Sequence, residues 1–353
     1  MKYSIILFLV FLEVFVSASC TKSRSQNHSF SSPITTPVTS VSPTSQIADT
    51  IPATPPIKPK GSNLTPFEIR DYIAKYQSDE FFEMDDLWKK LGIESGEWQR
   101  GYRCKVKIFP LQFSNDLGKE VMLRLTPSQG DTRFIFFRKS DRSSAWELTA
   151  KLDVDEINWG HAQHRMIAIR NQRWFVINKL TGTGSGYSRF DEIWYEINQQ
   201  KITPVLSYPV YGFTTFFPNR KAAAKILKTK LVDGVPMITV QFSAAYSWYD
   251  SPQDRYNLWR KTQTVTFIKS KNTDKFVLDP NQSNATSEEI DMIYGGEGIA
   301  PEFLIHSNYE NILKIAKGNE GKAKKWLRLF MESSRLPDTP EIQRLNQLLV
   351  PKY

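Results

Sequence analysis

The sequence predicts an α+β fold: predominantly antiparallel β meander sheets, with two N-terminal helices and several C-terminal helices. Apolar residues recur at helical spacing before residue 92 and after residue 286, but with a period of two between residues 103 and 280. The segments with a period of two follow one another too closely for crossover helices, which favours antiparallel hairpins. An apolar content of 40% in 353 residues is sufficient for one large or two ordinary domains.

Residues 1–20 have the organisation of an export signal. Lys2 precedes an apolar run over residues 5–16, and small residues follow before Cys20. This run is shorter than the ~20 residues that cross a bilayer, so it predicts a signal peptide over residues 1–19. The segment Ser17-Ala18-Ser19-Cys20 resembles the lipobox of bacterial lipoproteins. The resemblance implies that Cys20 becomes the acylated first residue of the mature protein; the alternative is ordinary secretion with cleavage after Ala18.

Residues 20–63 are dominated by Ser, Thr and Pro and contain few large apolar side chains. Such a segment cannot bury enough apolar surface to offset its chain entropy, so we expect a disordered tether. Cys104 is the only other cysteine and has no partner once Cys20 is acylated; a disulfide between the two is the alternative. We therefore expect an exported protein of the cell envelope, anchored to a bacterial membrane by lipid, or else a secreted or periplasmic one.

The folded part begins near residue 64, and we divide it into a β-rich domain with N-terminal helices, residues 64–213, and an α+β part, residues 214–353, which can belong to the same domain. Thr65, Pro66 and Glu68 form the signature of a capped helix start. Ile69, Tyr72, Ile73 and Tyr76 follow at helical spacing, and a second helix is expected from Ser78 until Gly92 ends it.

The strands are expected where apolar residues alternate, and Asp233-Gly234 is a strong hairpin turn signal. No internal repeat is strict enough to predict a propeller, although the number of strands leaves that topology open. The expected strands include residues 104–108, 121–125, 134–137, 146–152, 166–169, 174–177, 193–197, 202–206, 226–232, 237–242, 264–268 and 276–278.

Helices are expected to return over residues 286–350, because three helix starts are recognisable there. Thr286 with Glu289 and Ser307 with Glu310 have capping-box spacing, and Thr339 precedes Pro340. We interpret the apolar stripes of these helices as core.

The charge pattern argues against a nucleic-acid partner. Of the net charge of +9, residues 1–63 contribute +3 and residues 64–353 the other +6. A mild excess of this kind lacks the concentrated basic face of a nucleic-acid binder. We expect a membrane contact through the N-terminal lipid and a glycan or protein partner, and no motif indicates a cofactor.

Aromatic residues supply the candidate ligand-binding site. Five of them cluster where the pattern is loop-like, and exposed rings on a sheet edge stack on sugars or contact proteins; a core or loop-anchoring role is the alternative. They are Tyr246, Trp248, Tyr249, Tyr256 and Trp259.

Metal and phosphate sites have weaker support. His161 and His164 form a His-x-x-His pair with Asp153 and Asp155 upstream, yet no third ligand stands at a fixed spacing, so we predict no metal site. The glycine-rich segment 182–186 precedes a strand and not a helix, which favours a hairpin tip over a phosphate loop.

The function expected from these features is that of a non-catalytic, membrane-tethered envelope lipoprotein with a ligand- or partner-binding domain. The alternative is an exported hydrolase that acts on an envelope polymer or glycan. Glu297, Asp153 and Asp155 are its candidate acids, and two carboxyls about 5 to 9 Å apart would support it.

Overall fold

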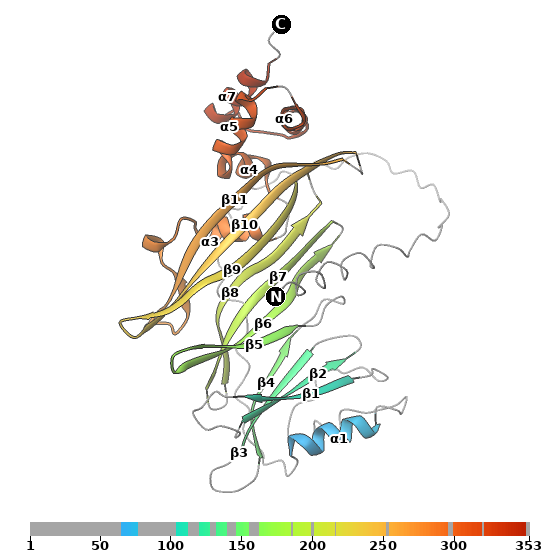
Figure 1. The fold of residues 1–353 in the computed structure, drawn as a ribbon, viewed down its shortest axis with the longest axis vertical. Helices are drawn as coiled ribbons and strands as arrows, with labels where there is room; N and C mark the ends of the chain where they lie inside the picture. The colour runs from blue at the N-terminus through green and yellow to red at the C-terminus, as the bar shows by residue number, and fades with distance from the viewer. Residues whose placement is uncertain are drawn as a thin grey trace, which may run out of the picture. The chain divides into compact units, whose positions relative to one another are not determined.

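A computed structural model describes residues 65–76, 104–111, 120–127, 132–139, 146–154, 162–184, 186–198, 201–215, 217–251, 254–295, 299–319 and 321–350 (Figure 1). All of these residues belong to one unit, residues 46–353. The predicted signal peptide, Cys20 and the tether lie outside the described residues, as does the second expected helix, residues 78–92.

The first expected helix is α1, Pro66–Tyr76. Its start has the reciprocal capping box that the sequence predicts: the Glu68 amide donates to Thr65 Oγ1, and the Thr65 amide donates to the Glu68 carboxylate. Ile69 is fully buried, and α1 packs on β1 and β2 of the first sheet.

The first sheet is a four-stranded antiparallel meander, β1 to β4 in chain order. Pro110 lies in β1, an edge strand, where a missing N–H donor is tolerated. The strands are β1 Cys104–Leu111, β2 Glu120–Pro127, β3 Thr132–Lys139 and β4 Trp146–Val154.

The second sheet has eight antiparallel strands, again in chain order, so the expected meander is confirmed. Asp233 and Gly234, both with positive φ, form the expected turn between β9 and β10. The strands are β5 Gln163–Ile169, β6 Gln172–Gly184, β7 Tyr187–Asn198, β8 Lys201–Thr214, β9 Asn219–Val232, β10 Val235–Ser251, β11 Asp254–Lys269 and β12 Phe276–Leu278. The expected division between residues 213 and 214 falls within the end of β8, where this strand pairs with β9 in the same sheet.

Successive side chains of each strand point to opposite faces of the second sheet, and the two faces contribute to two different hydrophobic cores. Phe175 and Ile177 pack with Phe134 and Phe136 of the first sheet. The other face of the second sheet carries Trp174, Trp194 and Phe242 and packs against the C-terminal helices, so we call it the helix face.

The C-terminal helices are η3 Pro280–Gln282, α3 Ser287–Tyr294, α4 Pro301–Ser307, α5 Tyr309–Lys317, α6 Lys322–Ser333 and α7 Pro340–Leu349. The caps at Thr286 and Thr339 are confirmed. The cap expected at Ser307 is wrong: Ser307 is the last residue of α4, its hydroxyl donates to the Leu304 carbonyl, and α5 begins after Asn308. Only Asn308 separates α4 from α5, so the capping pattern of Ser307 and Glu310 predicts a helix start at a residue that ends the preceding helix.

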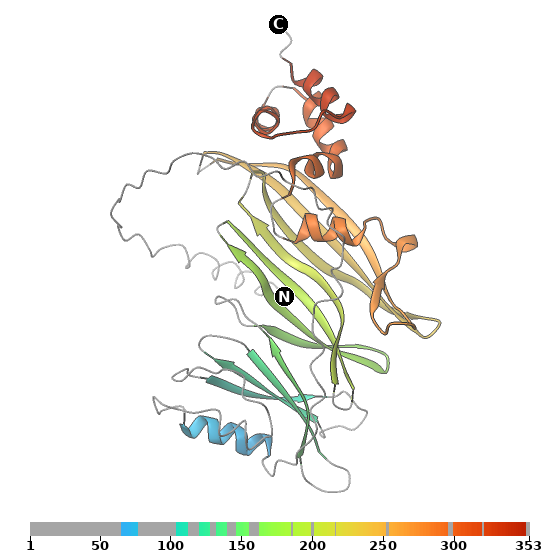
Figure 2. The ribbon, with the colours of Figure 1, turned by 180° about the vertical axis from the view of Figure 1, so that it is seen from behind.

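Helix α3 lies against the helix face (Figure 2), where two arginines of the second sheet contact it, Arg220, which is buried, and Arg189, which is partly exposed. Arg220 of β9 donates to the Met292 carbonyl at 2.8 Å, near the end of α3. Arg189 of β7 bridges Asp191 and Asp291, each at 2.8 Å. A guanidinium at a helix C-terminus also complements the helix dipole. Within the described residues no helix combines the length and apolar character needed to cross a bilayer.

Candidate functional site

The second sheet opens between β8 and β9. The two strands pair only where Tyr211–Thr214 faces Arg220–Ala223, while β9 pairs with β10 along almost its whole length. A bulge in β8, opposite Phe190 and Asp191, marks the point where β8 departs from its neighbour. Bulges bend and twist a strand, so β8 and β9 separate beyond this point.

A cavity of about 410 Å³ occupies this opening, and we call it the β8–β9 cavity. One wall is formed by residues 224–226 of β9. The other lining residues come from four successive strands: Arg165 of β5, Asn178 of β6, Glu192 of β7, and Tyr208, Val210 and Tyr211 of β8. Strand register explains their proximity, because Glu192 lies opposite Asn178 on one side and Tyr208 on the other.

Glu192 is the central charge of the cavity and is only 2% exposed. Its Oε1 accepts hydrogen bonds from Trp194 Nε1 at 2.8 Å and from the Tyr208 hydroxyl at 2.5 Å. Its Oε2 accepts from Arg165 Nη2 at 2.5 Å. A buried carboxylate needs such donors to offset the loss of hydration. This carboxylate is therefore held in place by three strands at once.

Tyr208 is held in its neutral, donating form. Burial raises the pKa of its hydroxyl well above the ordinary value of 10, and the negative charge of Glu192 adds to the effect. The ring packs against Phe242 and Phe267 of the helix-face core. With a neutral phenol and a fully engaged carboxylate, the cluster is suited to holding a shape and not to passing a proton.

Two groups in the cavity are suited to contact a ligand. The side chain of Arg165 is 44% exposed, and within the described part of the chain only one of its N–H groups, on Nη2, makes a hydrogen bond. Asn178 Oδ1 is buried and has no hydrogen-bond partner among the described residues. A buried acceptor without a donor costs about 1–3 kcal/mol, so a donating group that enters the cavity would gain that energy. The cavity thus combines a cationic donor with an acceptor.

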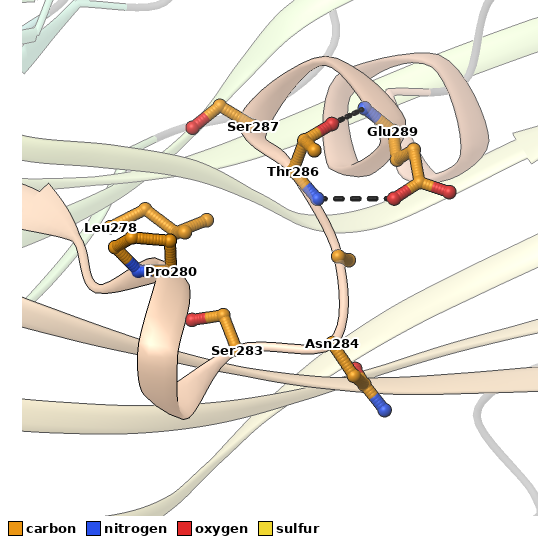
Figure 3. A pocket seen from close by; sticks show the side chains of 8 residues that line it. Leu278, Pro280, Ser283, Asn284, Thr286, Ser287 and Glu289 are labelled. Carbon is orange, nitrogen blue, oxygen red and sulfur yellow. Dashed lines mark hydrogen bonds between the residues drawn. The ribbon is translucent and has the colours of Figure 1, made fainter.

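A second hollow, of about 570 Å³, lies where α3 begins (Figure 3). Figure 3 shows Thr286 and Glu289 pointing toward each other across the helix start, joined by the two hydrogen bonds of the capping box. Ser283 and Asn284 accept from the Thr266 and Thr264 amides and so cover the edge of β11. The polar groups here are used to build the loop, and we place the candidate site at the β8–β9 cavity.

The five aromatic residues lie in β10 and β11, so the expectation that they stand in loops is wrong. Long alternating strands carry them, and alternation turns Tyr246, Trp248 and Trp259 to the helix face. Tyr246 and Trp248 are buried, and the rings of Tyr246 and Trp259 stack with centroids 4.6 Å apart. Trp259 Nε1 donates to Asn308 Oδ1, next to α4. These residues join the sheet to the helices.

Tyr249 and Tyr256 are exposed near the end of the hairpin where β10 leads into β11. The guanidinium of Arg255 lies 5.9 Å from the centroid of the Tyr249 ring. None of the five aromatic residues lines the β8–β9 cavity. A ligand-binding role for them stays a prediction.

The candidate metal and acid residues are not gathered at one place in the described structure. His164 lies in β5 with its ring against Phe109, Phe134 and Phe175. Asp153 is paired with Arg133 at 2.5 Å and with Lys151 at 3.0 Å.

His161, Asp155 and Glu297 lie outside the described residues, and so does the side chain of Cys104. Among the described residues no three His, Cys, Asp or Glu side chains are close enough to hold a metal ion.

The glycine-rich segment is confirmed as a hairpin between β6 and β7. A Cβ at Gly184 would lie 2.6 Å from the Tyr187 ring, and Gly186 has a φ of 89°. The ring therefore lies directly over the backbone of the opposing strand, which accounts for the glycine.

Sequence reasoning missed Arg165, Asn178, Glu192 and Tyr208. One signal was present: Glu192 and its neighbour Asp191 are two acids between the apolar residues Phe190 and Ile193 of one strand. Its partners come from other strands, and nothing in the local pattern names them. No protein-family model matches the chain, and a comparison with curated proteins finds no match.

Proposed function

We propose that this chain is an exported lipoprotein of a bacterial envelope, anchored through Cys20 and held off the membrane by residues 20–63. Its folded part binds a glycan or protein partner in the β8–β9 cavity. The signal-like start of the sequence supports the anchor. The observation that carries the binding role is the cavity itself, where the sheet opens beside Arg165 and beside Asn178 Oδ1, which has no hydrogen-bond partner in the part of the chain that the structure describes.

The size and lining of the cavity suit a small polar group at the end of a larger partner. A volume of 410 Å³ falls within the range of ligand pockets, and sites of this kind fix their ligands with a few placed polar groups. A sugar hydroxyl or a peptide amide donates to the amide oxygen of Asn178 and accepts from Arg165. Glu192 holds Arg165 in position and does not itself meet the ligand as a free acid.

The anchor is tested by expressing the full chain in a bacterium with labelled palmitate and comparing it with Cys20→Ser. We expect label and membrane fractionation in the parent and neither in the variant. Mass spectrometry of an unacylated mature product that retains Met1 would contradict the proposal.

The binding role is tested by titrating soluble Cys20→Ser protein with peptidoglycan fragments and envelope oligosaccharides, and with peptides from envelope proteins, by calorimetry. Asn178→Leu and Arg165→Gln should each weaken any binding found by at least about 10-fold, the loss of one good hydrogen bond to a charged or buried group. Arg335→Gln removes the same charge from an exposed loop and should leave the affinity unchanged. Unchanged affinity in both cavity variants would refute this assignment of the site.

A further inference from the structure

The lysines of β9 lie on one face of the second sheet. Lys221, Lys225, Lys228 and Lys230 do not share one parity in the sequence, so simple alternation would divide them between two faces. The register with β10 resolves this. The four lysines lie opposite Ala245, Gln241, Thr239 and Met237, which are alternate residues of β10 and hence share a face.

A bulge at Leu227 is the reason. The register shifts between Thr239 and Val240, so Leu227 is the extra residue of β9. It returns Lys228 and Lys230 to the face of Lys221 and Lys225. Ala224 and Ile226 belong to the helix-face core, so the four lysines stand on the opposite face. We call these four residues the lysine row.

The surroundings of the lysine row contain little negative charge. Lys221, Lys225 and Lys228 are exposed and Lys230 is half-buried, and none of them forms an ion pair within the described residues. Their register partners in β10 are uncharged, and the next residue beyond Ala245, on β11, is Arg260. The one acid in residues 219–249 is Asp233, at the turn. The positive potential of the row is therefore not neutralised by its neighbours.

Exposed aliphatic side chains accompany the lysine row on the same hairpin. Leu227 is 48% exposed at the bulge, and Val232 is 38% exposed beside the turn. In Figures 1 and 2 the β9–β10 turn lies at the end of the hairpin away from helices α4 to α7. Basic residues with adjacent exposed aliphatic groups are the composition of segments that lie on an anionic lipid surface.

We propose that the lysine row, with Leu227 and Val232, docks on the surface of a bilayer rich in anionic phospholipids. At about 3.3 Å per residue, the row extends over roughly 30 Å, which suits a surface of many headgroups better than a single bound anion. The aliphatic groups favour a bilayer over a hydrated polyanion, because only the bilayer offers them an apolar layer to enter. This contact deepens the proposed envelope function by giving the folded part its own membrane contact, separate from the acyl anchor.

The test uses full-length Cys20→Ser protein, which carries no acyl group, and sedimentation with vesicles of phosphatidylglycerol or of phosphatidylcholine. We expect binding to phosphatidylglycerol that weakens as salt is raised, and little binding to phosphatidylcholine. Changing all four lysines of the row to glutamine should weaken binding by roughly 600-fold, at about five-fold for each charge. The matched control changes Lys201, Lys271, Lys314 and Lys317, four exposed lysines elsewhere, and should retain binding.

A second variant separates the aliphatic contribution. Leu227→Ser with Val232→Ser should weaken vesicle binding while leaving the salt dependence in place, since the charges remain. Equal losses in the row variant and the control variant, or binding to soluble polyphosphate without binding to phosphatidylglycerol vesicles, would overturn the proposal. Because the protein lacks the acyl group, failure here leaves the anchor at Cys20 untouched, and failure of palmitate labelling leaves this result untouched.

Discussion

Replacing Glu192 by alanine should destabilise the fold strongly, because this carboxylate is the common acceptor for three strands. Its removal leaves Trp194 Nε1 and the Tyr208 hydroxyl without their acceptor. The Arg165 side chain, 44% exposed, is free to turn toward water. Most of the loss in stability should therefore come from the two buried donors, the Trp194 indole N–H and the Tyr208 hydroxyl.

The magnitude follows from the number of stranded groups. Each buried donor left without a partner costs about 1–3 kcal/mol, so the two together cost about 2–6 kcal/mol. The ion pair with half-exposed Arg165 adds at most about 1 kcal/mol. We expect a loss of about 4 kcal/mol for Glu192→Ala and about 1–2 kcal/mol for Glu192→Gln, whose amide oxygen still accepts a hydrogen bond.

Urea unfolding followed by tryptophan fluorescence measures these differences in free energy of unfolding. The control is Glu147→Ala in β4, an exposed carboxylate whose removal should change the free energy by less than about 0.5 kcal/mol. A loss below about 1 kcal/mol for Glu192→Ala would refute the reasoning, since it would mean that the two donors find other partners.

Three further changes test other parts of the fold. Burial lowers the pKa of His164 to about 4, and the charge of Arg124 adds to the effect. Between about pH 6.5 and 4 the unfolded chain therefore binds more protons than the folded one. The free energy of unfolding should fall as the pH falls through that window, and it should fall less in His164→Phe. Trp326→Ala should lower the free energy of unfolding by about 3–5 kcal/mol because the ring is fully buried. Leu329→Ala, which removes an exposed side chain from the same helix, should change it little. Equal urea midpoints for the two variants would contradict this prediction. Gly184→Ala should lower the free energy of unfolding by about 1–3 kcal/mol, because the added methyl group meets the Tyr187 ring. Most of this loss should vanish when Tyr187 is also changed to alanine. A loss that is the same with and without the ring would show that backbone conformation is responsible.

Much of the architecture could be predicted because its signals are local. The capping box at Thr286, the turn at Asp233 and Gly234, and the change in apolar period each depend on residues a few positions apart. The meander order could also be predicted from local features, because connections this short join successive strands as antiparallel hairpins and leave no room for crossovers. Where two local signals overlap, as at Ser307 between two nearly continuous helices, the prediction fails.

The candidate site was decided by tertiary structure alone. Arg165, Asn178, Glu192 and Tyr208 stand on four strands, and only their register brings them together. The lysine row likewise depends on a single bulged residue, Leu227, which moves every later side chain of β9 to the other face.

By itself, then, the sequence determined most of the helices, strands and turns that the structure describes, because those choices depend mainly on contacts within a few residues. The exceptions are the strand ends that carry Tyr246 and Trp259 and the helix start expected at Ser307. The sequence also carries the apolar start before Cys20 and the Ser-, Thr- and Pro-rich segment from which we propose the anchor. Only the tertiary structure decided which polar groups meet and which face each lysine takes. The physical reason is that register between strands depends on bulges and distant pairing, and a shift of one residue reverses the face of every side chain that follows.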